Sequence, residues 1–226
     1  MPVRRTLLAG PVLEVAPKLL GMVVRRTTDE GTVAVRITEV EAYDGANDPG
    51  SHAFRGETPR NAVMFGPAGF LYVYFTYGMH YCMNVVLGPD GQPSAALIRA
   101  GEVIEGIELA RSRRGAPEPP AKFNQATPGR SPGRPTRRTP NPDRDLARGP
   151  ARLCVALGIT DRTPNGTDLL AKSSAVQLLP GPGFDGVPST GPRVGLRDAA
   201  DNPWRFWIPD DPTVSPYRPH VPKRRA

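Results

Sequence analysis

Cysteine is scarce in this sequence, with only Cys82 and Cys154 among 226 residues. A structural zinc site built from four cysteines is therefore excluded, because such a site needs four thiolates. Both cysteines lie inside apolar runs, which indicates buried thiols in a reducing compartment rather than a disulfide framework.

Long apolar runs are absent as well. No stretch of about eighteen apolar residues occurs, which argues against a transmembrane helix. The opening sequence MPVRRTLLAGPVLEV is a poor signal peptide, because Gly10, Pro11 and Glu14 interrupt its apolar part. At 226 residues and 38% hydrophobic content, the chain can bury one good core. We therefore expect a single domain over residues 1–226.

Net charge is missing from most of the chain. Residues 111–150 hold nine arginines and one lysine against Glu118, Asp143 and Asp145. The seven positive charges left over equal the net charge of the whole chain, +7. A positive charge gathered in one segment predicts a polyanionic partner.

The same 111–150 segment contains nine prolines, and between Gly115 and Arg144 its only large apolar residue is Phe123. Such a composition cannot pack a core, and proline interrupts both helices and strand ladders. We expect a disordered insert at about 115–144. It is either a solubilising linker or a flexible arm that holds phosphates without sequence preference.

Hydrophobic periodicity outside the insert predicts a compact α+β domain. We expect its core to be an antiparallel β-sheet or open barrel with flanking helices, followed by a frayed basic tail over 216–226. Helices are predicted at 11–20, 103–113 and 151–157, and strands at 22–27, 32–40, 70–75, 81–87, 95–100, 176–179 and 204–208.

Two charged residues stand at the ends of apolar strands. Glu41 follows a β-branched strand, and Arg99 ends the apolar run 95–98. A glutamate at a strand end is usually solvated, whereas an arginine beside such a run needs a partner if it is buried. The two could meet over a water, with the arginine keeping the carboxylate ionised and the carboxylate accepting a proton. A structural salt bridge is the alternative.

The run from Phe70 to Asn84 contains four tyrosines. On a strand, Tyr72 and Tyr74 share one face, and Tyr77 falls at the turn before Gly78. An aromatic ring at an exposed turn suits a wedge between DNA base steps, with a half-buried turn tyrosine as the alternative.

Asn84 lies in the otherwise apolar sequence YCMNVVL, so it either satisfies backbone groups or faces a polar ligand. His52 lies on a loop of small residues, where a histidine is more often an ordinary surface residue than a catalytic one.

These residues belong to segments that resemble the alkyladenine (3-methyladenine) DNA glycosylase family. The likeness is densest from Val40 to Gly88, where EAY, SHA, TPRN and YVYFTYGMHYCMN follow in the family's order and spacing, and it continues through LIRA. Further matching segments bring it to nearly the whole chain apart from the insert and the termini. They are 97–106, 149–159, 192–196 and 203–208.

The resemblance implies the catalytic groups of a base-excision-repair enzyme. Glu41 matches the general base that deprotonates the water attacking C1′ of a flipped nucleotide, and Arg99 matches the arginine that holds this water and carboxylate. Tyr77 matches the tyrosine that inserts into the minor groove. Val194 and Gly195 match a loop close to the catalytic water.

The resemblance also implies a pocket for the extruded base. Tyr43, His52 and Tyr74 match the residues that enclose it, and Leu97 matches an apolar part of the wall. Asn84 matches the amide that discriminates against the 2-amino group of normal guanine. An alkylated purine carries a positive charge, which electron-rich rings attract and which makes the base a good leaving group.

The resemblance thus implies a DNA-3-methyladenine glycosylase-type hydrolase, a monofunctional enzyme without a lyase step that acts on alkylated or deaminated purines. It implies no metal and no organic cofactor. We expect double-stranded DNA with a damaged purine as the partner, no membrane, and a monomer. We also expect a cytoplasmic protein, at the nucleoid in a bacterium or in the nucleus of a eukaryote. The insert exceeds the family pattern and the loop 44–51 carries Asn47-Asp48-Pro49-Gly50, so the preferred lesion does not follow.

Two other functions compete with this interpretation. Pro2, once Met1 is removed, could act as the Schiff-base amine of a bifunctional glycosylase and lyase, as in the formamidopyrimidine glycosylases, although these also need four zinc-binding cysteines. A non-enzymatic DNA-binding protein could use Tyr77 as its wedge, but that function leaves Glu41 and Asn84 unexplained.

Overall fold

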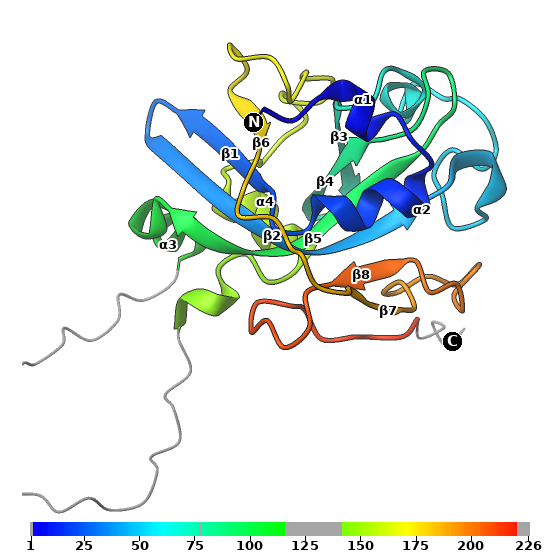
Figure 1. Ribbon diagram of the computed structural model, residues 1–226. Coiled ribbons are helices and arrows are strands. Elements are labelled where there is room, and N and C mark those ends of the chain that lie inside the picture. Colours follow the sequence, from blue (N-terminus) through cyan, green and yellow to red (C-terminus); the bar gives the residue numbers. More distant parts are fainter. Residues whose placement is uncertain (1, 77, 116–141, 221–226) are drawn as a thin grey trace, which may run out of the picture.

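A curled antiparallel sheet forms the core of the computed structural model, which describes residues 2–76, 78–115 and 142–220 (Figure 1). Hydrogen bonds join the main strands in the order β3-β4-β5-β2-β1-β6, so β3 and β6 are the two ends of an open sheet. β8 pairs with β2 and with β7. The strands are β1 (Val23–Thr28), β2 (Gly31–Tyr43), β3 (Leu71–Thr76), β4 (His80–Val86), β5 (Ala95–Glu105), β6 (Val176–Leu179), β7 (Ser189–Gly191) and β8 (Arg205–Trp207).

Short helices cover the sheet. The N-terminal helices lie on one side of β2 and β5, and β7 and β8 lie on the other side (Figure 1). α4 packs against β4 and β5, and α3 packs against α4. The α-helices are α1 (Arg5–Leu8), α2 (Val12–Val15), α3 (Ile107–Arg114) and α4 (Pro150–Ala156), and the 3-10 helices are η1 (Ala16–Leu19), η2 (Gly45–Asn47), η3 (Ala62–Phe65) and η4 (Pro142–Asp145).

β2 changes, partway along its length, which of its faces is turned to the core. The register against β5 shifts between Ile37 and Glu39, leaving Thr38 without an opposite residue. Odd-numbered residues pack in the core before the shift and even-numbered ones after it, because an extra residue reverses the alternation of side chains. The core residues concerned are Val33, Val35 and Ile37, then Val40 and Ala42.

A second register shift lies directly opposite, in β5. Glu39 pairs with Ala100 and Val40 with Ile98, so Arg99 has no opposite residue on β2. Bulges of this kind bend a strand and redirect a side chain. The two shifts together turn Glu39, Glu41 and Arg99 to the same region of the sheet, where they contact one another.

The predicted fold class is confirmed, since the molecule is an α+β domain built on an open antiparallel sheet. One predicted helix is wrong in its first part. Val103–Glu105 belong to β5, and α3 begins only at Ile107. β-branched Val103 and Ile104 extend the strand, and Gly106, with a φ of +71°, makes the turn into the helix. β7, α1 and the 3-10 helices η2, η3 and η4 were not predicted.

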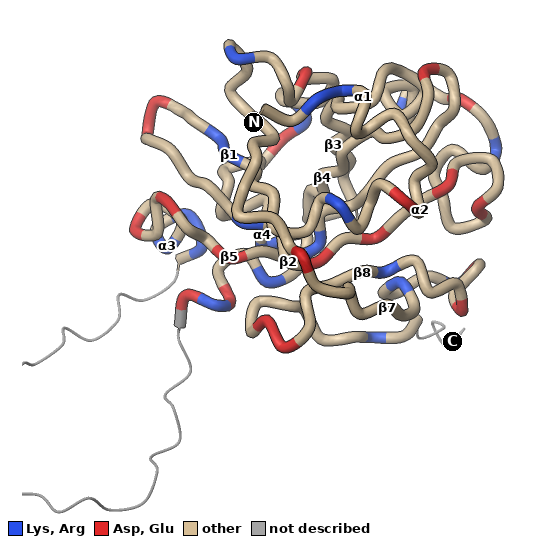
Figure 2. The backbone as a smooth tube through the Cα atoms, viewed as in Figure 1, with Lys and Arg blue, Asp and Glu red and all other residues tan. Residues whose placement is uncertain are grey.

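The predicted disorder of the insert falls mostly on residues 116–141, which lie outside the described residues. The insert was expected to extend to about residue 144, whereas the structure has the helix η4 at Pro142–Asp145. Arg111 of α3 donates to both carboxylate oxygens of Asp143, at 2.8 and 2.7 Å. Figure 2 shows basic residues on α3 and α4.

Both cysteines are buried and free, as predicted. In the described part of the chain, no helix combines the length and apolar character that crossing a membrane requires.

The turn at Gly106 gives a test of the fold. A Cβ at this position would collide with the carbonyl oxygen of Thr32, and the positive φ is unfavourable for alanine. We expect Gly106→Ala to lower the free energy of unfolding by more than about 1 kcal/mol in denaturant titrations. Gly115, at the other end of α3, has a φ of +56° and no atom of the described residues within 4 Å of an added Cβ, so Gly115→Ala should cause the smaller loss. Equal losses would contradict the steric argument.

Candidate active site

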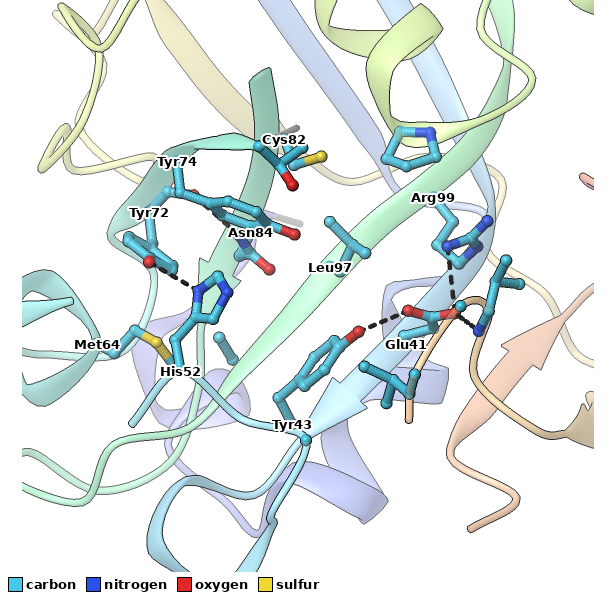
Figure 3. A pocket seen from close by; sticks show the side chains of 17 residues that line it. Glu41, Tyr43, His52, Met64, Tyr72, Tyr74, Cys82, Asn84, Leu97 and Arg99 are labelled. Carbon is cyan, nitrogen blue, oxygen red and sulfur yellow. Dashed lines mark hydrogen bonds and ion pairs between the residues drawn. The ribbon is translucent and has the colours of Figure 1, made fainter. Parts of the chain in front are cut away.

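A cavity of about 200 Å³ opens at the face of the sheet onto which Glu41 and Arg99 project (Figure 3). β2, β3, β4 and β5 each contribute side chains to it, and the loops around His52 and Val194 complete the wall. The lining residues are Glu41, Tyr43, Gly50, His52, Met64, Tyr72, Tyr74, Thr76, Cys82, Asn84, Ala95, Leu97, Arg99, Pro150, Val194, Gly195 and Leu196.

Glu41 lines this cavity and is nevertheless 0% exposed. Glutamates at strand ends are usually solvated, but the register shift in β2 turns this side chain from the core face to the cavity, where it is buried. Its Oε1 accepts a hydrogen bond from the backbone N–H of Val194 at 2.7 Å and lies 3.2 Å from Nη1 of Arg99. Its Oε2 accepts a hydrogen bond from the hydroxyl of Tyr43 at 2.8 Å. These donors stabilise a negative charge on a buried carboxylate.

Arg99 is 6% exposed and lies between two carboxylates. Burial opposes its charge, but Glu41 and Glu39 beside it raise its pKa above the ordinary value, so it stays a cation. Glu41 and Arg99 lie together as expected, in a direct ion pair, and the water and their catalytic roles stay predictions. Sequence reasoning missed Glu39, whose Oε1 accepts a hydrogen bond from Nε of Arg99 at 2.9 Å. The Glu-Val-Glu alternation at 39–41 was the available signal, since it places both carboxylates on one face of a strand.

Aromatic rings form the opposite wall. Tyr72 and Tyr74 share one face of β3, as predicted, with ring centroids 5.6 Å apart. His52 meets Tyr74 edge to face at 4.6 Å, and its Nδ1 lies 3.0 Å from the hydroxyl of Tyr72. Desolvation against these rings, together with the charge of Arg60, lowers the pKa of His52 to about 4. Desolvation also raises the pKa of Tyr43 and of Tyr74 well above 10, so at neutral pH these three side chains are uncharged.

Asn84 and Leu97 are register partners on β4 and β5. Asn84 is 4% exposed, and its amide nitrogen donates to the carbonyl oxygen of Tyr72 at 3.1 Å. This bond fixes the amide, whose side chain faces the cavity (Figure 3). Tyr77 lies outside the described residues, so its predicted insertion into the minor groove stays a prediction.

Cys82 was predicted as a buried thiol but not as a residue of the site. Burial raises its pKa to about 11, so it remains a protonated, unreactive thiol in the wall. Among the described residues, no three His, Cys, Asp or Glu side chains gather in a way that could hold a metal ion.

Arg193 supports the cavity from behind, although sequence reasoning assigned it no role. It is 1% exposed, its Nη2 donates to Oδ1 of Asp48 at 2.7 Å, and its Nη1 donates to the carbonyl oxygen of Ala42 at 2.9 Å. Its guanidinium carbon lies 4.6 Å from the ring centroid of Tyr43. Because Val194 follows directly in the chain, Arg193 holds both the tyrosine ring and the backbone amide that binds Glu41.

The ion pair of Asp48 and Arg193 has no exposed side-chain surface. We expect Asp48→Asn to lower the free energy of unfolding by about 3–5 kcal/mol, because it leaves a buried guanidinium without its counter-charge. Asp198→Asn is the matched control, since the pair of Asp198 and Arg197 is exposed and should contribute less than about 1 kcal/mol. Denaturant unfolding measures both, and similar losses would show that burial does not govern the effect.

Comparison with known proteins identifies one family. The model of the methylpurine-DNA glycosylase family matches residues 6–212. A protein of Streptomyces avermitilis is 52% identical over 99% of this chain and 95% of its own length. Proteins of Leifsonia xyli and Nocardia farcinica are 50% and 47% identical, over 92% and 90% of this chain and 89% and 85% of their own lengths. All three are named provisionally as 3-methyladenine DNA glycosylases. The chain belongs to the methylpurine-DNA glycosylase family.

Proposed function

We propose that this DNA glycosylase flips a damaged purine out of duplex DNA and hydrolyses its N-glycosidic bond with a water activated by Glu41. The observation that carries the proposal is the position of Glu41. It is a fully buried carboxylate that lines an aromatic cavity and faces the cationic Arg99. Membership of the family agrees with a hydrolase of DNA repair that acts on alkylated bases.

In this mechanism the water oxygen attacks C1′ of the extruded nucleotide, and Glu41 accepts the water's proton. The bond between C1′ and the purine nitrogen breaks, and its electron pair leaves with the base. The products are a free purine and an abasic site that carries a hydroxyl at C1′. Arg99, Val194 and Tyr43 hold the carboxylate in place during the transfer. The step involves no amine nucleophile, so the strand is not cleaved.

The uncharged rings of Tyr43, His52 and Tyr74 surround the site of the base (Figure 3). An alkylated purine is a cation, which aromatic faces attract, and cleavage neutralises it as it leaves. A neutral lesion such as hypoxanthine lacks that advantage and needs a proton on the departing base. The chemistry of this site therefore favours cationic lesions in the bond-breaking step.

Basic residues next to the cavity suit the phosphates of duplex DNA. A groove of about 440 Å³ shares Arg99, Pro150 and Val194 with the cavity. Arg148, Arg152 and Arg218 also line this groove, although Asp145, which pairs with Arg148, lies there too. Arginines beside an active site hold the DNA backbone without reading its sequence.

The competing functions fit the site less well. Pro2 is not among the residues that line the cavity, so a Schiff base at its nitrogen would form away from the buried carboxylate. A protein that only binds DNA has no use for a buried Glu41. Borohydride trapping separates the first case, because a covalent adduct through residue 2 would establish a lyase.

Glu41→Gln tests the mechanism. We expect single-turnover release of free purine to fall by about 10²–10⁴-fold, because an amide cannot accept the proton. The dissociation constant for a lesion-bearing duplex should stay close to that of the wild type, since the base acts in the transition state. Glu102→Gln alters an exposed ion pair with Arg36 and should leave both quantities unchanged. A near-normal rate in Glu41→Gln would disprove the mechanism.

Asn84→Ser tests how normal guanine is rejected. A shorter side chain opens space for the 2-amino group and removes the fixed amide. We therefore expect release of normal guanine to rise, by about 10-fold if one unfavourable polar contact of about 1.4 kcal/mol is relieved. Release of 7-methylguanine from the same sequence context is the control. A selectivity ratio equal to that of the wild type would show that this amide is not the filter.

A further inference from the structure

A second buried carboxylate lies directly behind the proposed catalytic one. Glu39 is 0% exposed and does not line the cavity. Its Oε1 accepts hydrogen bonds from Nε of Arg99 at 2.9 Å, from Nε of Arg205 at 2.6 Å and from the hydroxyl of Ser215 at 2.9 Å. Its Oε2 accepts a hydrogen bond from the backbone N–H of Ser215 at 2.7 Å. A carboxylate with this many donors is a fixed point of the structure.

Glu39 determines which nitrogen of Arg99 is left for Glu41. Nε of Arg99 is bound to Glu39, and Nη2 donates to the hydroxyl of Ser215 at 3.2 Å. A guanidinium is rigid and planar, so holding two of its nitrogens fixes the third. The third, Nη1, lies 3.2 Å from Oε1 of Glu41.

Charge is balanced in the same group of residues. Glu39 and Glu41 are two negative charges, and Arg99 and Arg205 are two positive ones, with all four side chains at most 8% exposed. Arg205 directs its Nε to Glu39 and its Nη2 to the carbonyl oxygen of Ser215, at 2.8 Å. Arg99 therefore forms ion pairs with both carboxylates, whereas Arg205 forms its ion pair with Glu39.

We propose that Glu39 is a positioning residue that orients Arg99 toward Glu41 and, by sharing the charge of Arg99, keeps Glu41 a strong enough base to deprotonate water. This inference rests on the proposed function of Glu41. A carboxylate with Arg99 entirely to itself would hold its negative charge more tightly and would accept a proton less readily. Glu39 prevents that.

The C-terminal part of the chain completes the arrangement. Residues 211–215 run alongside β2. Asp211 pairs with Arg36 at 2.7 Å, the hydroxyls of Thr213 and Thr38 are hydrogen-bonded at 2.8 Å, and the backbone N–H of Ser215 donates to Glu39. Ser215 lies beyond residue 212, where the match to the family model ends. Through the contacts of Ser215 with Glu39 and Arg99, this segment reaches the residues next to Glu41.

The pH dependence of catalysis distinguishes positioning from a merely structural role. Removing the charge of Glu39 takes a like charge away from Glu41 and leaves Arg99 undivided, and both changes favour the ionised form of Glu41. The acidic limb of the pH–rate profile should therefore move to lower pH. The other titratable or charged groups around Glu41 are Tyr43 of β2, Arg99 of β5, Tyr74 of β3, Cys82 of β4 and its register partner Arg205 of β8, and none of these is altered.

The experiment measures single-turnover release of 7-methylguanine from a duplex by the wild type and Glu39→Gln, across the pH range in which the protein is folded. This cationic base needs no proton to leave, so no general acid contributes to the profile, and the protonation of His52, whose pKa is about 4, is common to the wild type and the variant. We expect Glu39→Gln to slow release at neutral pH by about 10-fold or more and to keep the duplex dissociation constant within about 2-fold. Its acidic limb should lie at lower pH.

One conservative variant separates the charge of Glu39 from its packing, and a second variant elsewhere serves as the control. Glu39→Asp keeps the charge and should keep the acidic limb at its wild-type position, and Glu102→Gln should behave as the wild type throughout. If Glu39→Gln does not fold, Ser215→Ala takes its place. It removes the hydroxyl that contacts both Glu39 and Arg99, and it should slow release while leaving duplex binding intact.

An acidic limb that does not move in Glu39→Gln would overturn the inference, as would a wild-type rate in either Glu39→Gln or Ser215→Ala. A wild-type protein that releases no purine from any of the lesions tested would instead overturn the proposed function. The two failures are therefore distinguishable.

Discussion

The buried charge of Arg99 is the constraint on which this site depends. Arginine does not lose its proton inside a protein, so a guanidinium that is 6% exposed must be matched by negative charge. Glu39 and Glu41 supply that charge from positions two residues apart on one strand. The second cation, Arg205, then restores the balance from β8. The site is therefore one closed electrostatic group, and a change at any member alters the surroundings of the others.

Two register shifts make this group possible. An uninterrupted alternation along β2 would keep Val33, Val35, Glu39 and Glu41 on one face, and the glutamates would point into the apolar core. Thr38, which has no opposite residue on β5, reverses the alternation of side chains. The same strand therefore contributes first to the core and then to the cavity. The matching shift at Arg99 keeps β5 paired with β2 on both sides of the irregularity. β8 extends the arrangement, because it pairs with β2 at Glu39–Glu41, just beyond the stretch at which β1 pairs.

Much of this arrangement could be predicted from local patterns. Glu41, Arg99 and Asn84 stand out because each is a polar residue beside or within an apolar strand, and the structure brings Glu41 and Arg99 into contact. The sheet could be predicted for the same reason, since its strands alternate or are rich in β-branched residues. Periodicity failed at Val103–Glu105, where a spacing of apolar residues that fits a helix is used by a strand.

The supporting residues could not be predicted because their partners are distant in the chain. Ser215 lies 176 residues from Glu39, and Arg193 lies 145 residues from Asp48. No local pattern distinguishes these residues from ordinary surface serines, arginines and aspartates. The register shift was missed for a related reason, since an unpaired Thr38 is defined by the neighbouring strand and not by its own sequence. Long-range pairing, rather than local preference, sets the geometry around Glu41.

The ion pair of Arg111 and Asp143 joins the two ends of the segment between α3 and η4. Arg111 and Asp143, which lie on either side of residues 116–141, are therefore held together, and neither lines the cavity. The entropic cost of bringing the two ends of a connecting segment together changes only slowly with the number of residues between them. This junction is a natural position at which related chains can gain or lose residues, or at which a second module can be grafted, while the core keeps its shape.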